Sequence, residues 1–126
     1  MEFDELSNRV IGCALEVHKT LGAGLLESAY KECLAYELKV NGISFELEKE
    51  LPVTYKEIQI PCGYRIDMIV KRNLILELKS VSTILPIHEA QILTYMKLSN
   101  IPIGLLINFN MKKLKEGIKR FVLNPS

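Results

Sequence analysis

The sequence predicts a mixed α/β protein in which helices flank a central sheet. Apolar residues recur every three or four positions in two segments near the N-terminus, which indicates amphipathic helices. Several shorter segments then alternate between apolar and polar residues or are almost continuously apolar, as strands do. A helical segment between two of these strands is typical of a right-handed crossover that joins parallel strands.

The first predicted helix covers residues 4 to about 19, and the second covers about 25–40. Gly22 and Gly24 lie between the two helices and favour a turn. In the first helix the recurring apolar residues are Leu6, Val10, Cys13, Ala14, Val17 and Leu21. In the second helix we expect one apolar side, made by Leu26, Ala29, Cys33, Tyr36 and Val40.

Strand character follows the second helix. Residues 43–50 alternate between apolar and polar, and residues 53–60 are predicted to form a second extended stretch. Residues 64–70 and 74–81 are two short strands. They are joined by residues 71–73, which predicts a β-hairpin.

The remaining segments complete the predicted sheet. Pro86 suits the first turn of a helix, which we expect to reach about Leu98. Residues 103–109 are almost all apolar, which is the signature of a buried central strand. A lysine-rich turn with a break at Gly117 precedes residues 118–123, which predict a last edge strand.

Length and composition exclude several classes of protein. The 126 residues are 48% hydrophobic and 25% charged, which fits one globular domain over residues 1–126. A net charge of +1 argues against a globally basic nucleic-acid coat protein, although a basic patch stays possible. No apolar run reaches the roughly 18–20 residues that span a bilayer, and the acidic N-terminus is unlike a signal peptide. We therefore expect a cytoplasmic protein with no membrane partner.

The three cysteines, Cys13, Cys33 and Cys62, are far apart and form no Cys-x-x-Cys pair. This spacing excludes a zinc knuckle, a thioredoxin-like motif and an iron–sulfur cluster held by four cysteines. We expect all three to be small buried apolar residues in a reducing compartment.

The predicted hairpin brings acidic residues together. A loop at residues 71–73 places Asp67 opposite Glu77, and alternation along the strands then points Asp67, Glu77 and Lys79 to one side. The other side receives the apolar residues Ile66, Met68, Val70, Leu74, Leu76 and Leu78. Opposed carboxylates repel each other. Lys79 offsets part of this repulsion, and Mg²⁺ would offset more, with the Leu78 carbonyl as a further oxygen ligand.

Each of these features has a simpler alternative. The polar side of the hairpin could be a solvated strand face with a surface ion pair worth about 0–1 kcal/mol. His88, Gln91 and Tyr95 share one face of the third predicted helix, where Gln and Tyr can hydrogen-bond a phosphate or order a water. Without the hairpin, a half-buried helix with polar tips is the favoured explanation of these three residues. Glu27, in the first turn of its helix, is also explained by the helix dipole alone.

The second helix begins with a motif that resembles a known family. Gly24-x-x-Glu27-x-x-Tyr30 matches the signature of the GxxExxY proteins. Three further stretches, at residues 63–67, 88–91 and 104–109, are similar to the same family. The resemblance covers almost the whole chain.

The hairpin and the third helix resemble a larger group, the PD-(D/E)XK nucleases. Asp67 followed by Glu77-Leu78-Lys79 resembles their core, and Gln91-x-x-x-Tyr95 resembles the motif that follows this core in the exonuclease branch. Ile66 stands where the name of the group has proline, a departure that is common in this superfamily.

The resemblance implies a restriction-endonuclease-like fold with an αβββαβ core, a mixed central sheet flanked by helices, and an extra N-terminal helix. It also implies roles for the site residues. In this assignment Asp67 and Glu77 bind Mg²⁺ or Mn²⁺, Lys79 assists the attacking water, and Glu27 adds a carboxylate. Gln91 and Tyr95 would position the substrate phosphate, and Tyr30 and His88 would contact the substrate or the residues that hold it.

The leading hypothesis is therefore a small metal-dependent nuclease that hydrolyses phosphodiester bonds in DNA. One alternative is a non-catalytic module on the same fold that binds nucleic acid or protein, as a homodimer or within a larger complex. Another is a metal hydrolase of a small phosphorylated metabolite, which would use the same pocket.

Overall fold

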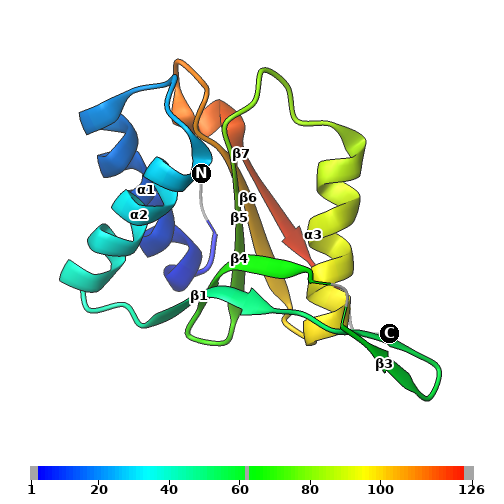
Figure 1. Ribbon diagram of the computed structural model, residues 1–126. Helices are drawn as coiled ribbons and strands as arrows, with labels where there is room; N and C mark the ends of the chain where they lie inside the picture. Colours follow the sequence, from blue (N-terminus) through cyan, green and yellow to red (C-terminus); the bar gives the residue numbers. More distant parts are fainter. Residues whose placement is uncertain (1–2, 62, 124–126) are drawn as a thin grey trace.

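The computed structural model describes residues 3–61 and 63–123 and contains two helical layers around a sheet (Figure 1). The elements, in chain order, are α1 (Glu5–Leu21), α2 (Glu27–Val40), β1 (Phe45–Glu50), β2 (Val53–Tyr55), β3 (Ile58–Ile60), β4 (Arg65–Val70), β5 (Leu74–Lys79), α3 (Pro86–Ser99), β6 (Ile103–Asn108), the 3₁₀ helix η1 (Leu114–Gly117) and β7 (Ile118–Val122).

The central sheet has five strands in the order β1-β4-β5-β6-β7. Strand β6 runs parallel to β5 and every other neighbouring pair is antiparallel, so the sheet is mixed. Helices α1 and α2 cover one face and α3 covers the other (Figure 1). The predicted mixed α/β fold is confirmed, and so is the crossover through α3 that joins β5 to β6.

Helix α1 is fixed at its start by Asp4. One Asp4 oxygen accepts a hydrogen bond from the Ser7 backbone N–H at 3.0 Å, and the other accepts from the Ser7 hydroxyl at 2.7 Å. This is the N-cap that the first turn of a helix requires. Arg120 on β7 contacts the same carboxylate at 2.9 Å, which ties the helix to the far edge of the sheet.

Helix α3 approaches the sheet closely because residue 104 is a glycine. A Cβ atom there would lie 2.7 Å from the Met96 sulfur and 3.0 Å from the Ile92 Cδ1. Both side chains are fully buried in the core between α3 and the sheet. Gly104 thus sets the distance between α3 and β6.

The predicted apolar side of α2 is wrong. Leu26 is 76% exposed, and Tyr36 and Val40 are also exposed. The buried side chains of this helix are Tyr30, Leu34, Ala35 and Leu38. The Tyr30 ring stacks on Phe109, with centroids 4.5 Å apart, and this contact turns the other apolar stripe toward the sheet.

The predicted extended stretch at residues 53–60 is instead a hairpin. Strands β2 and β3 pair antiparallel in a separate two-stranded sheet that projects from the body of the molecule (Figure 1). The turn is at Lys56, which adopts a positive φ of 54°. Neither glycine nor asparagine marks this turn, so the usual hairpin signal is missing from the sequence.

Two expectations from the composition concern the burial of the cysteines and a membrane-spanning segment. Cys13 is buried, as predicted, and Cys33 is half-buried, while Cys62 lies outside the described residues. Within residues 3–61 and 63–123, no helix combines the length and the apolar character needed to cross a membrane.

Candidate active site

The hairpin of β4 and β5 has the predicted register. Val70 pairs with Leu74 and Met68 with Leu76, so the loop is residues 71–73 and the next two opposed residues are Asp67 and Glu77. At that point the side chains replace the backbone ladder. The Asp67 N–H donates to Glu77 Oε1 at 3.1 Å, and the Leu78 N–H donates to Asp67 Oδ2 at 2.9 Å. These two residues, the carboxylate pair, therefore lie within the hairpin itself.

The apolar side of the hairpin departs from the prediction at one residue. Met68 packs under α1 and α2, with Val70, Leu74, Leu76 and Leu78. Ile66 belongs instead to the core on the α3 side, together with Ile69. The Asp67 side chain turns toward β5 to reach the Leu78 N–H, and this interrupts the strict alternation of β4.

The carboxylate pair carries an uncompensated repulsion. Glu77 is only 4% exposed. Burial raises the pKa of the Glu77 carboxyl to about 8, and the charge of Asp67 and a hydrogen bond between the two side chains act in the same direction. The Asp67 N–H and the ammonium of Lys79 oppose this shift without cancelling it. The pair therefore favours either a shared proton or a bound cation near neutral pH.

Lys31 is a site residue that the sequence analysis missed. Its Nζ lies 3.3 Å from Asp67 Oδ1 and also forms an ion pair with Glu48. Partial burial would lower the pKa of Lys31, but hydrogen bonds and charges from Glu48 and Asp67 raise it above its ordinary value. Lys31 lies four residues after Glu27 and shares its side of the helix, but this spacing does not place that side beside Asp67.

Lys79 ends β5 beside a buried polar residue, Asn108. The Asn108 side chain is 1% exposed. It accepts from the Val81 N–H at 3.1 Å and donates to the Val81 carbonyl at 2.9 Å. The Lys79 carbonyl accepts from the Phe109 N–H at 2.8 Å. These bonds hold the chain on both sides of Lys79. The sequence indicated them through Asn108, a polar residue at the end of an otherwise apolar strand, because a buried polar side chain needs hydrogen-bond partners.

Glu27 does not join the carboxylate pair in a three-ligand cluster. It is the first residue of α2 and is exposed. Across the described part of the chain, no group of three or more His, Cys, Asp and Glu side chains is arranged to hold a metal. The structure thus brings Asp67 and Glu77 together but not Glu27. Glu27 lies on the same side of α2 as Lys31, whose side chain contacts Asp67.

Tyr30 is buried and positions the turn before α2. Its hydroxyl donates to the Gly22 carbonyl at 2.6 Å and accepts from the Leu25 N–H at 3.2 Å. The Leu25 carbonyl in turn accepts from the Ser80 hydroxyl at 2.6 Å. The start of α2 is therefore tied to the residue that follows Lys79. This placement favours a positioning role for Tyr30 over contact with a substrate.

Helix α3 carries Gln91 and Tyr95 one turn apart. Tyr95 is 6% exposed. Burial raises the pKa of its hydroxyl, and so do the charges of Glu77 and Asp67, while a hydrogen bond from Gln91 acts in the opposite direction. The fourth predicted residue, His88, accepts from the Leu85 N–H at 3.0 Å through Nδ1 and thereby caps the start of the helix.

The donor set fits a divalent cation. Mg²⁺ is usually bound by one or two carboxylates, with water and substrate phosphate completing its coordination. Asp67 and Glu77 supply two carboxylates, and burial and the charge of Asp67 raise the pKa of Glu77 despite the Lys79 ammonium. A divalent ion between them would remove that repulsion.

Comparison with known proteins identifies the family of the chain. A family model described as the PD-(D/E)XK nuclease superfamily matches residues 4–121, which is almost the whole chain. The five-stranded mixed sheet with its flanking helices is consistent with the restriction-endonuclease-like fold. The narrower resemblance to GxxExxY proteins stays a prediction. No curated protein and no solved structure matches the chain.

Proposed function

We propose that this chain, which belongs to the PD-(D/E)XK nuclease superfamily, is a divalent-metal-dependent nuclease that hydrolyses phosphodiester bonds in DNA. The observation that supports this most directly is the carboxylate pair. Asp67 and Glu77 lie side by side, Glu77 is buried, and Lys79 is close enough to influence the Glu77 carboxyl. Such a buried acidic pair costs stability when both carboxyls are ionised and no cation is bound.

Mg²⁺ or Mn²⁺ is the proposed cofactor. Asp67 and Glu77 would hold the ion, with the Leu78 carbonyl and Glu27 as further oxygen ligands, directly or through water. When bound, the ion supplies the positive charge that stabilises a phosphate in its transition state and lowers the pKa of the attacking water. The side chain of Glu77 must be ionised for this, so we expect metal binding to displace its proton.

The remaining roles follow from position around the pair. The Lys79 ammonium would orient the attacking water or neutralise charge that develops on the phosphate. Gln91 and Tyr95 would hydrogen-bond the phosphate from the α3 side. Their positions one turn apart on α3 and the influence of the Glu77 charge on the Tyr95 hydroxyl support this assignment. His88 would act by fixing the first turn of α3.

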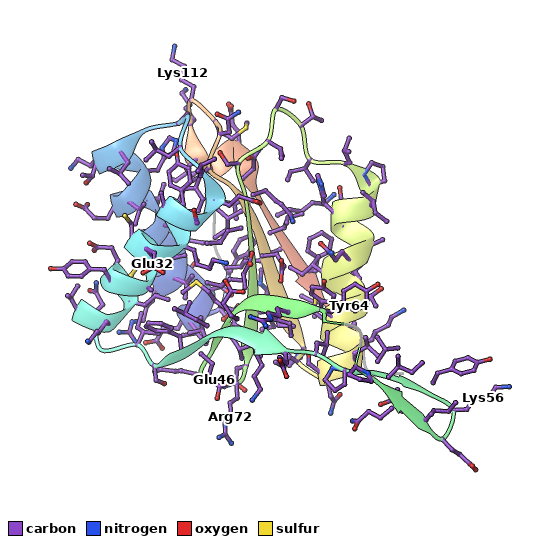
Figure 2. The ribbon with its side chains drawn as sticks, in the orientation of Figure 1. Glu32, Glu46, Lys56, Tyr64, Arg72 and Lys112 are labelled. Atoms are coloured by element: carbon purple, nitrogen blue, oxygen red, sulfur yellow. The ribbon has the colours of Figure 1, made fainter. Side chains whose placement is uncertain are left out.

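The direct test is cleavage of linear and circular DNA by the purified chain with Mg²⁺ or Mn²⁺. We expect activity that EDTA abolishes and that Glu77→Gln and Lys79→Met each lower by roughly a hundredfold or more. The matched controls are Glu32→Gln, on the exposed side of α2, and Lys112→Met, which Figure 2 shows at the tip of a loop. Full activity in the Lys79→Met protein would refute the assignment.

One observation favours the non-catalytic alternative. The Lys31 ammonium already contacts the Asp67 oxygen that a metal would need, and no third acidic ligand joins the pair among the described residues. Calorimetric titration with Mn²⁺ separates the two cases. Heat of binding that disappears in Glu77→Gln supports the nuclease, whereas no binding at millimolar Mn²⁺ supports a binding module.

A further inference from the structure

A groove of about 410 Å³ lies between α3 and Tyr64, which is three residues before Asp67. Its volume falls within the roughly 300–1,000 Å³ that ligand sites occupy. The lining is mainly apolar and aromatic, and it includes Val53, Tyr64, Ile87, Gln91, Tyr95 and Leu98. Of the described residues that line the groove, none is charged. Such a lining does not suit the phosphate backbone of a nucleic acid, which needs positive charge.

Two tyrosines shape the groove, and one of them also belongs to the candidate active site. The Tyr64 ring is 47% exposed, whereas Tyr95 is 6% exposed. Their centroids are 6.3 Å apart, with the planes tilted by 56°. Figure 2 shows Tyr64 next to α3. Tyr95 packs in the same buried cluster as Ile66, the residue before Asp67, so the groove lies next to the part of β4 that carries Asp67.

We propose that this groove receives an unpaired nucleobase next to the scissile phosphate, so that the protein prefers nucleic acid that is single-stranded at the cut. This inference rests on the proposed nuclease function. A nucleobase is a flat, uncharged ring system that stacks on aromatic side chains, and the exposed face of Tyr64 supplies such a surface. The Gln91 amide can hydrogen-bond the edge of the base.

The preference for single strands follows because only an unpaired base can reach Tyr64 at no unpairing cost. In a duplex each base is stacked and paired, so it cannot place its face against Tyr64 without being extruded. A base next to a nick, an overhang or a free strand pays no unpairing cost. With the phosphate at Asp67 and Glu77, a neighbouring base on the α3 side of the sheet would meet the groove that Tyr64 and Tyr95 shape.

The experiment measures binding without cleavage. Fluorescence anisotropy in EDTA compares a labelled single strand with a blunt duplex of the same sequence, for the wild-type chain and three variants. We expect tighter binding of the single strand. Tyr64→Ala should weaken it roughly 5- to 150-fold, the range for loss of one base–aromatic stack, without changing duplex binding. Tyr64→Phe keeps the ring and should keep the affinity.

Tyr36→Ala is the matched control, because Tyr36 is an exposed tyrosine on α2, across the sheet from the groove. A strand that carries 2-aminopurine provides a second readout. Its fluorescence should be quenched by the wild-type chain and by Tyr64→Phe, and much less by Tyr64→Ala. Equal affinity for single strand and duplex, or unchanged binding by Tyr64→Ala, would overturn the proposal. So would a Tyr64→Ala effect confined to self-association, which would make the groove a protein contact.

Cleavage of the same two substrates with Mg²⁺ separates this proposal from the function on which it rests. Tyr64-dependent binding of the single strand without any cleavage would remove the nuclease assignment and support the base site. Cleavage of both substrates at one rate, insensitive to Tyr64→Ala, would support the nuclease and overturn the base site.

Discussion

The backbone N–H of Asp67 donates a hydrogen bond to the Glu77 carboxylate at 3.1 Å, at the point where an antiparallel pair would bond backbone to backbone. The Asp67 carboxylate returns the interaction through the Leu78 N–H at 2.9 Å. The hairpin thus holds two acidic side chains by main-chain donors, which fixes their geometry before any ligand arrives. Fixed geometry of this kind keeps the carboxylates together despite their repulsion.

The first prediction concerns pH and the metal-free protein. The pKa of Glu77 is about 8 in the folded chain against an ordinary 4.5, so between these values the folded state binds a proton that the unfolded state does not. Stability from this group is therefore complete at low pH and falls as pH rises toward 8. The loss is at most on the order of a few kcal/mol. Urea unfolding in EDTA at pH 6 and pH 8.5 measures it.

The control for this prediction is Glu77→Gln, in which residue 77 cannot ionise. Its free energy of unfolding should no longer differ between pH 6 and pH 8.5 because of this group. Asp67→Asn should reduce that difference, because it removes the second cause of the raised pKa. Adding Mg²⁺ should restore stability at pH 8.5 more than at pH 6 in the wild-type chain only. A Glu77→Gln protein with an unchanged pH dependence would show that another group is responsible.

The second prediction concerns Lys31, whose ammonium occupies Asp67 Oδ1 at 3.3 Å. A divalent cation on the carboxylate pair would be repelled by this charge, so Lys31→Met should tighten Mn²⁺ binding, by up to about tenfold. Calorimetry at constant ionic strength measures the change. Lys39→Met, which removes an exposed lysine from the same helix, should leave the affinity unchanged. Weaker binding by Lys31→Met would mean that Lys31 holds Asp67 in place for the metal.

The hairpin was predictable from the sequence and the Lys31 contact was not. A loop at residues 71–73 allows only one alignment of the two strands, so the opposition of Asp67 and Glu77 follows from local chain geometry. The contact of Lys31 with Asp67 depends on how α2 lies across the sheet. No local pattern encodes that placement, because it results from packing between distant segments.

The packing of helix α2 was also not predictable from local sequence. Its sequence carries two apolar stripes, and their spacing alone does not decide which one is buried. The choice is made by Tyr30, which stacks on Phe109, the residue that follows β6. The buried polar residue Asn108 is similar, since its bonds to Val81 appear only when β6 lies beside β5.

The third prediction follows from the two hydrogen bonds of the Tyr30 hydroxyl. Tyr30→Phe leaves the Gly22 carbonyl and the Leu25 N–H without this partner while keeping the stack on Phe109. We expect a loss of about 1–3 kcal/mol in the free energy of unfolding. Tyr36→Phe, at an exposed position of the same helix, should change it by less than about 0.5 kcal/mol. Equal stabilities of the two variants would show that the Tyr30 hydroxyl is dispensable.

The last prediction uses two glycines with opposite surroundings. Gly104→Ala places a methyl group 2.7 Å from the Met96 sulfur and should destabilise the protein by about 1–3 kcal/mol, because the buried side chains of Met96 and Ile92 must repack. Gly12 lies on an exposed face of α1 with nothing within 4 Å of an added Cβ. Gly12→Ala should therefore stabilise the protein by about 0.5–1 kcal/mol through helix propensity. Urea unfolding of both variants tests the pair, and a Gly104→Ala protein as stable as Gly12→Ala would mean that α3 does not depend on close contact with β6.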